Sequence, residues 1–303
     1  MDWIVRGALE FLELASKEEK PFFLYFATTL QHGPDRLGTK YQGDPLVTPV
    51  GYLEEALQVM PDRESISRRI EETGLAADRA DVLWLDDGIA ALLNKLEETG
   101  ELDKSVIFFM NDHARESGKG SLYQGGIHTA GFVWGPEYVN GGTRSGQMVS
   151  NIDLVPTVLD ICDIDIPADY KLDGRSFYSL LKGNEMPVHS SLFFEIGATR
   201  AVLMDGWKYI AFRTPREKLP LLAANGARPT HINDRPDGRG SEQPAIRFYP
   251  NYFEADQLYN INDDPLERRN RFEEMKGSRL LETLQDELRR FLEGVPEGFG
   301  EFK

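Results

Sequence analysis

Apolar residues recur every three or four positions in four stretches of the chain, a spacing that is typical of helices burying one face. In the first stretch, Ile4, Ala8, Phe11 and Leu12 share a face, and a charged segment before Pro21 ends the pattern. The spacing predicts helices over residues 4–15, 76–100, 152–161 and 278–292.

Short apolar runs between these stretches predict buried strands. Three of them lie in the first part of the chain, at residues 22–26, 106–110 and 131–134. Because both faces of such runs are apolar, we expect a parallel sheet covered by helices. The pattern therefore predicts an α/β fold for residues 1–185.

A different order follows in residues 186–303, where four short strand candidates precede the last helix. They lie at residues 191–195, 201–204, 207–212 and 255–259. Strands followed by one helix are typical of a small α+β subdomain with an antiparallel sheet. Two segments rich in Gly, Pro and Asp, residues 32–62 and 215–250, are predicted to be long irregular loops.

The number of predicted strands is low for residues 1–185, because a typical sheet has about 5 or 6 strands. The chain also opens on a helix that has no earlier strand to cover. We therefore expect these residues to form the later part of a larger α/β domain.

The composition and net charge of the chain exclude some classes of binding partner. The chain of 303 residues is 41% hydrophobic and 28% charged, which is ordinary for a soluble globular protein. Its formal net charge of −16 argues against binding to nucleic acid or to an acidic membrane surface. The start resembles no secretory signal, and the longest apolar run, residues 22–27, is far shorter than the roughly 20 residues of a membrane helix. The single cysteine, Cys162, excludes an internal disulfide and is expected in the core.

Candidate chemistry follows the strand at residues 106–110, where Asp112 and His113 come directly before a glycine-rich loop. Ligands of open α/β sheets bind outside the carboxyl ends of strands. A carboxylate suits calcium or magnesium, and an imidazole also admits manganese or zinc. The alternative is a turn with an ordinary loop histidine, but the strand-end position favours a metal site.

Two further residues belong to the same hypothesis. Lys119 lies between two glycines, where backbone amides and an ammonium could hold an anion, although a solvated loop lysine is the commoner case. The nucleotide-binding pattern G-x-x-x-x-G-K-[ST] fails here, because Gly120 follows the lysine. His32 follows the predicted strand 22–26, and it would reach the same cleft if the two strands are neighbours, where it could protonate a leaving oxygen.

These residues resemble the sulfatase family of the alkaline phosphatase superfamily, and the resemblance runs in order through nearly the whole chain. The matching motifs are Pro21-Phe22-Phe23-Leu24-Tyr25 before His32, Leu85-Asp86-Asp87-Gly88-Ile89, Asp112-His113, Lys119-Gly120-Ser121-Leu122-Tyr123-Gln124-Gly125-Gly126, Ile152-Asp153-Leu154-Val155-Pro156-Thr157-Val158-Leu159-Asp160, Leu172-Asp173-Gly174-Arg175-Ser176, Trp207-Lys208-Tyr209-Ile210, and Gln257-Leu258-Tyr259-Asn260 with Asp263-Asp264-Pro265.

The resemblance implies a partial alkaline-phosphatase-like sheet and hydrolysis of sulfate esters through a covalent intermediate on a formylglycine hydrate. It implies a divalent metal, usually calcium, held partly by Asp112 and His113. Lys119 would contact the sulfate, and His32 would bind the sulfate or assist the leaving group. The substrate would be a sulfated small molecule or glycan. Members of the family are often periplasmic, secreted or lysosomal.

The chain also departs from the family pattern. Formylglycine arises in a C-x-P-x-R or S-x-P-x-R motif, and neither motif nor the paired aspartates of the first metal-binding strand occurs here. Gln124, His128 and Ala114 stand where Glu, Arg and Gly are commoner. We therefore expect a truncated sulfatase with an incomplete active site, and no activity from the chain alone.

Two alternatives to a sulfatase stay open at this stage. One is a phosphodiesterase or phosphonate hydrolase of the same superfamily, because an Asp-His metal pair also occurs there. The other is a non-catalytic fragment that binds sulfated ligands or is completed by an amino-terminal partner chain.

Overall fold

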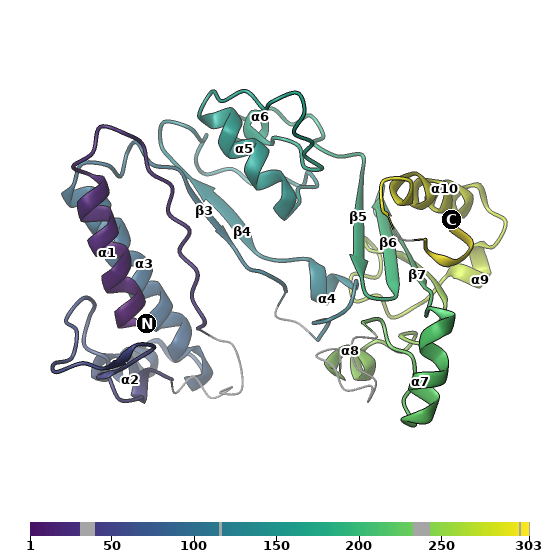
Figure 1. The fold of residues 1–303 in the computed structure, drawn as a ribbon, viewed down its shortest axis with the longest axis horizontal. Helices are drawn as coiled ribbons and strands as arrows, with labels where there is room; N and C mark the ends of the chain where they lie inside the picture. Colours follow the sequence, from purple (N-terminus) through teal and green to yellow (C-terminus); the bar gives the residue numbers. More distant parts are fainter. Residues whose placement is uncertain (31–39, 115–116, 233–242, 297, 303) are drawn as a thin grey trace. The chain divides into compact units, whose positions relative to one another are not determined.

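The computed structural model describes residues 1–30, 40–114, 117–232, 243–296 and 298–302 (Figure 1). They form two compact units. The first comprises Met1–Ser105 with Gly135–Glu137, and the second comprises Val106–Trp134 with Tyr138–Lys303. The predicted domain boundary at residues 185 and 186 stays a prediction. Within the described residues, no helix has both the length and the apolar character needed to span a membrane.

The first unit is built on three helices. Figure 1 shows α1 (Asp2–Ala15) beside α3 (Ala80–Glu98), close to the predicted bounds, with α2 (Glu64–Thr73) nearby. The helices α1 and α3 approach closely at Gly88, because a Cβ there would lie 3.0 Å from the Val5 side chain. The shorter elements are η1 (Lys40–Gln42), β1 (Val47–Thr48), β2 (Gly51–Tyr52) and η2 (Ala77–Arg79).

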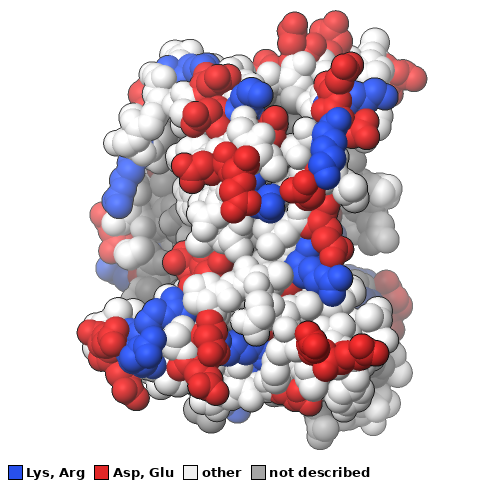
Figure 2. All heavy atoms as spheres, turned by 90° about the vertical axis from the view of Figure 1, so that its left-hand side faces the viewer, with Lys and Arg blue, Asp and Glu red and all other residues white. Residues whose placement is uncertain are grey.

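Ion pairs hold the second helix against its neighbours. Arg69 donates two hydrogen bonds to the carboxylate of Asp87 on α3, at 2.8 and 2.6 Å. Arg63 pairs with Asp2 at the start of α1. Figure 2 shows acidic and basic side chains interspersed over one face of the molecule. Exposed i,i+4 ion pairs also form within α1, at its carboxyl end and within α2, and each contributes little stability.

The predicted strand at residues 22–26 is wrong. The segment is not a strand, and its residues alternate between half-buried and exposed, with Phe23 69% and Tyr25 79% exposed. A strand requires a hydrogen-bonded neighbour, and none of the described strands pairs with this segment. Its apolar composition alone therefore does not produce a sheet.

The second unit begins with a two-stranded sheet whose bounds match the prediction. β3 (Ile107–Met110) pairs with β4 (Gly131–Trp134), and Phe109 lies opposite Phe132. The expected parallel arrangement is wrong for this pair, which is antiparallel. The chain leaves β3 at Met110 and enters β4 at Gly131, which lies opposite Met110. The second strand therefore runs in the opposite direction to the first.

The larger sheet is antiparallel throughout and confirms the predicted subdomain architecture. Its order is β5 (Ser191–Ile196), β6 (Thr199–Met204), β7 (Trp207–Phe212) and β8 (Asp256–Asn260). Asp205 and Gly206, both at positive φ, form the two-residue turn between β6 and β7. Leucines at positions 281, 284, 288 and 292 of α10 (Arg279–Leu292) join the core with β6 and β7, and Ser278 caps the helix.

Shorter helices complete the second unit, and three of them, η4, α7 and α8, correct the prediction of an irregular loop at residues 215–250. They are α4 (Gln124–Ile127), η3 (Asn151–Asp153), α5 (Leu154–Ile161), α6 (Tyr178–Leu181), η4 (Arg216–Lys218), α7 (Leu219–Ala224), α8 (Gln243–Phe248), α9 (Phe272–Met275) and η5 (Gly300–Phe302).

The expectation that Cys162 lies in the core is also wrong. It caps α5 and is exposed, because the helix ends before the residue can turn inward.

Candidate functional site

The residues predicted to bind metal follow β3 directly. The Asp112 side chain is 87% exposed, and its Oδ2 lies 3.6 Å from Nε2 of the half-buried His113. Nδ1 of His113 lies 2.8 Å from the carbonyl oxygen of Ala114. A proton on Nδ1 would be donated to this carbonyl, which leaves the lone pair of Nε2 beside the carboxylate. Imidazoles that bind metals are commonly oriented in this way.

This donor set fits one side of a divalent metal site. A carboxylate oxygen and a neutral imidazole nitrogen are suitable ligands for a hard or borderline cation. No group of three or more His, Cys, Asp or Glu side chains that could hold a metal occurs among the described residues. Among the described residues, Asp112 and His113 are therefore two candidate ligands, and a complete metal site would need further ligands.

Lys119 lies in a loop that closes on itself between β3 and β4. The Ala114 amide donates to the carbonyl of Gly126 at 3.1 Å, and the Ser121 amide and hydroxyl both donate to the carbonyl of Gly118. Gly118 and Gly126 touch, since a Cβ on Gly118 would lie 2.4 Å from the Gly126 nitrogen. These contacts bring the ends of the turn that carries Lys119 together with the segment that follows Asp112 and His113.

The glycine after the lysine has a separate role. Gly120 has a φ of 76°, in the left-handed region that side chains other than glycine rarely adopt. Lys119 itself is half-buried in the turn. The sequence pattern of a lysine between two glycines therefore reflects one close backbone contact, at Gly118, and one turn conformation, at Gly120.

A buried ion pair lies beneath this loop. Nζ of Lys208 on β7 is 2.5 Å from Oε1 of Glu267, and both side chains are fully buried. The ammonium also donates to the carbonyl of Leu122 at 2.8 Å and to Oε1 of Gln124 at 3.2 Å. Burial lowers the pKa of Lys208 and raises the pKa of Glu267, and the opposite charge of the partner opposes both shifts.

Sequence reasoning missed this pair. The one available signal was a lysine inside the apolar strand at residues 207–212, where a charged residue must be buried if the sheet is covered on both faces. Nothing comparable pointed to Glu267, which lies in a polar segment and has a positive φ.

An aromatic cluster supports the same loop. Tyr123 is fully buried, stacks on Tyr249 with ring centroids 3.7 Å apart, and donates to Oε1 of Gln257 at 2.6 Å. Burial raises the pKa of Tyr123. His231 stacks on Tyr252, and burial lowers its pKa to about 4. Tyr123, Tyr249 and Tyr252 belong to one buried cluster, which also includes Leu122 of the loop.

The other histidines have different settings. His32 lies outside the described residues, so its predicted place in the cleft stays a prediction. His128 is exposed at the end of α4. His189 contacts both carboxylate oxygens of the buried Asp153, at 2.9 and 2.8 Å, and Asp153 also accepts from the Ser150 and Arg175 amides. This pair joins the start of α5 to the segment before β5.

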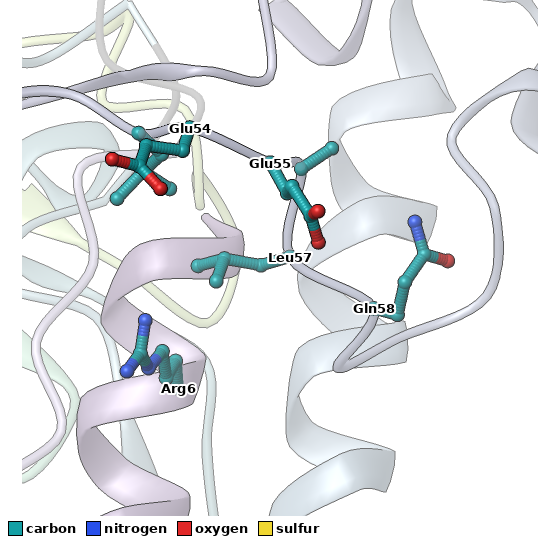
Figure 3. A pocket seen from close by; sticks show the side chains of 7 residues that line it. Arg6, Glu54, Glu55, Leu57 and Gln58 are labelled. Carbon is teal, nitrogen blue, oxygen red and sulfur yellow. The ribbon is translucent and has the colours of Figure 1, made fainter.

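A cavity of about 450 Å³ lies in the first unit, away from these residues in the sequence. Figure 3 shows Arg6 of α1 and the chain segment from Glu54 to Gln58 around it, with two carboxylates among the lining side chains. Nε of Arg6 already pairs with Glu10 at 2.7 Å. Two carboxylates and one paired guanidinium do not favour a sulfate group, so this cavity is not the candidate site.

Comparison with known families places the chain. The family described as Sulfatase matches residues 2–164, and the carboxyl-terminal family described as N-sulphoglucosamine sulphohydrolase matches residues 117–221. The first match covers more than half of the 303 residues.

Curated relatives carry the same family name. The chain is 26% identical over 195 residues to the uncharacterized sulfatase YdeN of Escherichia coli, and 29% identical over 200 residues to human N-acetylglucosamine-6-sulfatase. Each match covers 60% of this chain, but only 30% and 36% of the relative. The chain therefore spans about a third of the length of these relatives.

Solved structures share the fold. The crystal structure of Ps i-CgsB superposes with a TM-score of 0.62 at 21% identity, covering 97% of this chain and 54% of that one. BT4656, solved with its substrate D-glucosamine-2-N,6-O-disulfate, gives a TM-score of 0.56 at 16% identity and covers 96% of this chain and 69% of that one. These likenesses confirm the predicted α/β fold class with its antiparallel subdomain.

Proposed function

Because the chain belongs to the sulfatase family, we propose that it supplies part of a site that hydrolyses sulfate esters. One observation carries this proposal: at the carboxyl end of β3, Asp112 and His113 directly precede the residues that the Ala114–Gly126 and Gly118–Gly126 contacts bring together, and Lys119 follows Gly118. A pair of metal ligands followed closely by a cation would supply the charge neutralisation that a transferring sulfate group requires.

Each residue has a distinct task in this proposal. Asp112 and Nε2 of His113 would hold a divalent metal, and calcium is the family's usual ion; when bound, it withdraws charge from sulfate oxygens as a Lewis acid. Lys119 would contact the sulfate and neutralise its charge. His32 would bind the sulfate or give a proton to the leaving oxygen. This local positive charge is necessary because the chain as a whole carries a net charge of −16.

We propose a sulfated glycan or small sulfated sugar as the substrate class. Support comes from the relative N-acetylglucosamine-6-sulfatase, which is named for an amino sugar, and from BT4656, which was solved with its substrate D-glucosamine-2-N,6-O-disulfate. The 303 residues contain no C-x-P-x-R or S-x-P-x-R motif. We therefore propose that the nucleophile comes from another segment or from a complementing amino-terminal chain, and that this chain alone turns over no substrate.

The test begins with binding of inorganic sulfate to the full chain, with and without calcium, followed by nuclear magnetic resonance of the Lys119 amide. We expect sulfate to shift this signal, Lys119→Ala to abolish binding, and Asp112→Asn to remove the effect of calcium. Lys276→Ala is the matched control, because Lys276 is exposed and lies on the subdomain. No shift in the unmodified chain would overturn the proposed function.

Turnover separates the competing chemistries. The full chain is incubated with calcium and either an aryl sulfate, an aryl phosphate diester or an aryl phosphonate ester, and product is measured by absorbance. No product from the isolated chain supports the proposed incompleteness. Hydrolysis of the sulfate that depends on Lys119 would contradict incompleteness, and hydrolysis of the phosphate or phosphonate ester would contradict the sulfatase assignment.

A further inference from the structure

The Lys119 loop is attached to the four-stranded sheet by charged groups that are completely buried. The Lys208 ammonium has three donors, and three acceptors surround it: Glu267, the carbonyl of Leu122 and the side-chain carbonyl of Gln124. The second oxygen of Glu267 accepts the Gln124 amide at 2.5 Å. The ion pair thus contacts the loop through two backbone groups, the Leu122 carbonyl and the Gln124 amide, and through the side chain of Gln124.

The loop residues that contact Lys208 and Glu267 are only a few positions from Lys119 and are connected to it by further contacts. The segment held by Lys208 and Glu267 continues to Gly126, which touches Gly118 directly before Lys119. Ser121 donates twice to the carbonyl of Gly118, and Gly126 accepts the amide of Ala114, next to His113. A displacement of residues 122–126 would therefore move the lysine and the predicted metal ligands together.

Stability alone does not account for burying these charges. Removing an ammonium and a carboxylate from water is costly, and well-packed apolar side chains of similar volume are often as stable or more stable in their place. What apolar side chains cannot do is bind the Leu122 carbonyl and the Gln124 amide. The neutral side chain of Gln124 is consistent with this argument. It accepts a hydrogen bond from Lys208 without adding a second buried carboxylate, so Glu267 is the carboxylate that pairs with the ammonium.

We propose that Lys208 and Glu267 are positioning residues that hold the loop of residues 117–126, and through Gly126 the neighbouring Ala114, in an anion-binding conformation. They contact neither the sulfate nor the metal, and they act through the backbone of residues 122–126. The inference rests on the proposed function only for the identity of the anion. The conformational part stands on the contacts of the pair.

Hydrogen exchange of the full chain tests the conformational part. In Glu267→Gln and Lys208→Met we expect the amides of Ala114, Ser121 and Gln124 to exchange about tenfold faster or more, because each variant leaves a buried group without its partner. Arg290→Gln is the matched control, since it breaks an exposed ion pair of the same unit, and exchange in the loop should not change. Unchanged loop exchange in both single variants would overturn the proposal.

The double variant Lys208→Met with Glu267→Leu keeps the test decisive if a single variant fails to fold. It removes both charges and leaves none unpaired. We expect the free energy of unfolding to recover to the original value or above, while the loop amides stay fast and affinity for inorganic sulfate stays about tenfold lower. Recovery of loop exchange together with stability would show that the pair only fills space, and would overturn the proposal.

Lys119→Ala separates this inference from the proposed function. It should abolish sulfate binding and leave loop exchange unchanged, because Lys119 is held by the loop and does not hold it. If the unmodified chain binds no sulfate while exchange responds to the pair as expected, the positioning role stands and the assignment of the anion falls. Faster loop exchange in Lys119→Ala would contradict the proposed direction of support.

Discussion

The two sheets of the second unit have similarly apolar strands but very different burial. In the four-stranded sheet, Val202 of β6 and Ile210 of β7 are 0% exposed. In the two-stranded sheet, Phe132 and Trp134 of β4 are 58% and 39% exposed. The difference lies in the neighbours, because β7 has a strand on each side and α10 against it, whereas β3 and β4 have only each other among the described strands. Apolar composition thus indicates that a strand can be buried without identifying what buries it.

The largest expected effect comes from the buried side of this comparison. Leu284→Ala removes a side chain of α10 that is 0% exposed against the larger sheet. We expect it to lower the free energy of unfolding by about 2–5 kcal/mol, through lost transfer energy and a residual cavity. Urea denaturation followed by circular dichroism measures this loss, and a value below about 1 kcal/mol would mean that the subdomain core is not packed as described.

A pH effect sharpens the comparison, because His231 is buried behind the larger sheet. Burial lowers its folded-state pKa to about 4, from an ordinary value of 6.5. The unfolded chain therefore binds this proton first as the pH falls, and stability is lost between pH 6.5 and about 4.

The corresponding variant is His231→Leu. The unmodified chain should lose about 3 kcal/mol more than the variant between pH 7 and pH 4, as measured by urea denaturation at each pH. Equal pH dependence in the two proteins would show that the imidazole takes up its proton in the folded state.

A helix cap gives a smaller effect on the same side. The Ser278 hydroxyl accepts the Leu281 amide at the start of α10, and a Ser278→Ala change should cost about 1 kcal/mol. The thermal unfolding midpoint measures it. Ser278→Asp serves as the control, because aspartate can replace the hydroxyl as a cap and should keep the midpoint near its original value.

The smallest effect is expected on the exposed side. Phe132→Ala removes a ring that stacks on Phe109 with centroids 5.0 Å apart, yet this ring is more than half exposed. We expect a loss below about 1 kcal/mol. Binding of a hydrophobic dye should fall in the same variant. A loss as large as that of Leu284→Ala would show that β4 is buried in solution and would remove the contrast.

Local patterns predicted the positions of the helices α1, α3, α5 and α10 and of the strands β3 to β8, since helical spacing and short apolar runs depend on neighbouring residues alone. Strand 207–212 and strand 131–134 were placed correctly for this reason. Pairing was harder, because the direction of β4 depends on how residues 111–130 fold back through the contact of Gly118 with Gly126. The Gly and Pro content of residues 215–250 led to the prediction of an irregular loop, although the segment contains the short helices α7 and α8.

The candidate site also contains residues that the sequence indicated and residues that it did not. Asp112, His113 and Lys119 were identified from residue type and strand-end position. In the structure Asp112 and His113 directly precede the loop closed by the contacts of Gly126, Lys119 lies within it, and their roles stay predictions. The Lys208–Glu267 pair could not be inferred, because its members are 59 positions apart in the numbering and meet only through the register of β7 with β8. Long-range polar contacts leave no periodic trace in the sequence.

The contact between Gly118 and Gly126 also constrains how this protein can evolve. Neither position has room for a methyl group, so the first step of an exchange to any other residue meets backbone atoms at about 2.4 Å. To make room for a larger side chain, the backbone segments around Gly118 and Gly126 would have to move apart together, which a single substitution does not achieve. We expect the loop to be inherited as one block, with sequence drift concentrated in the exposed segments around it.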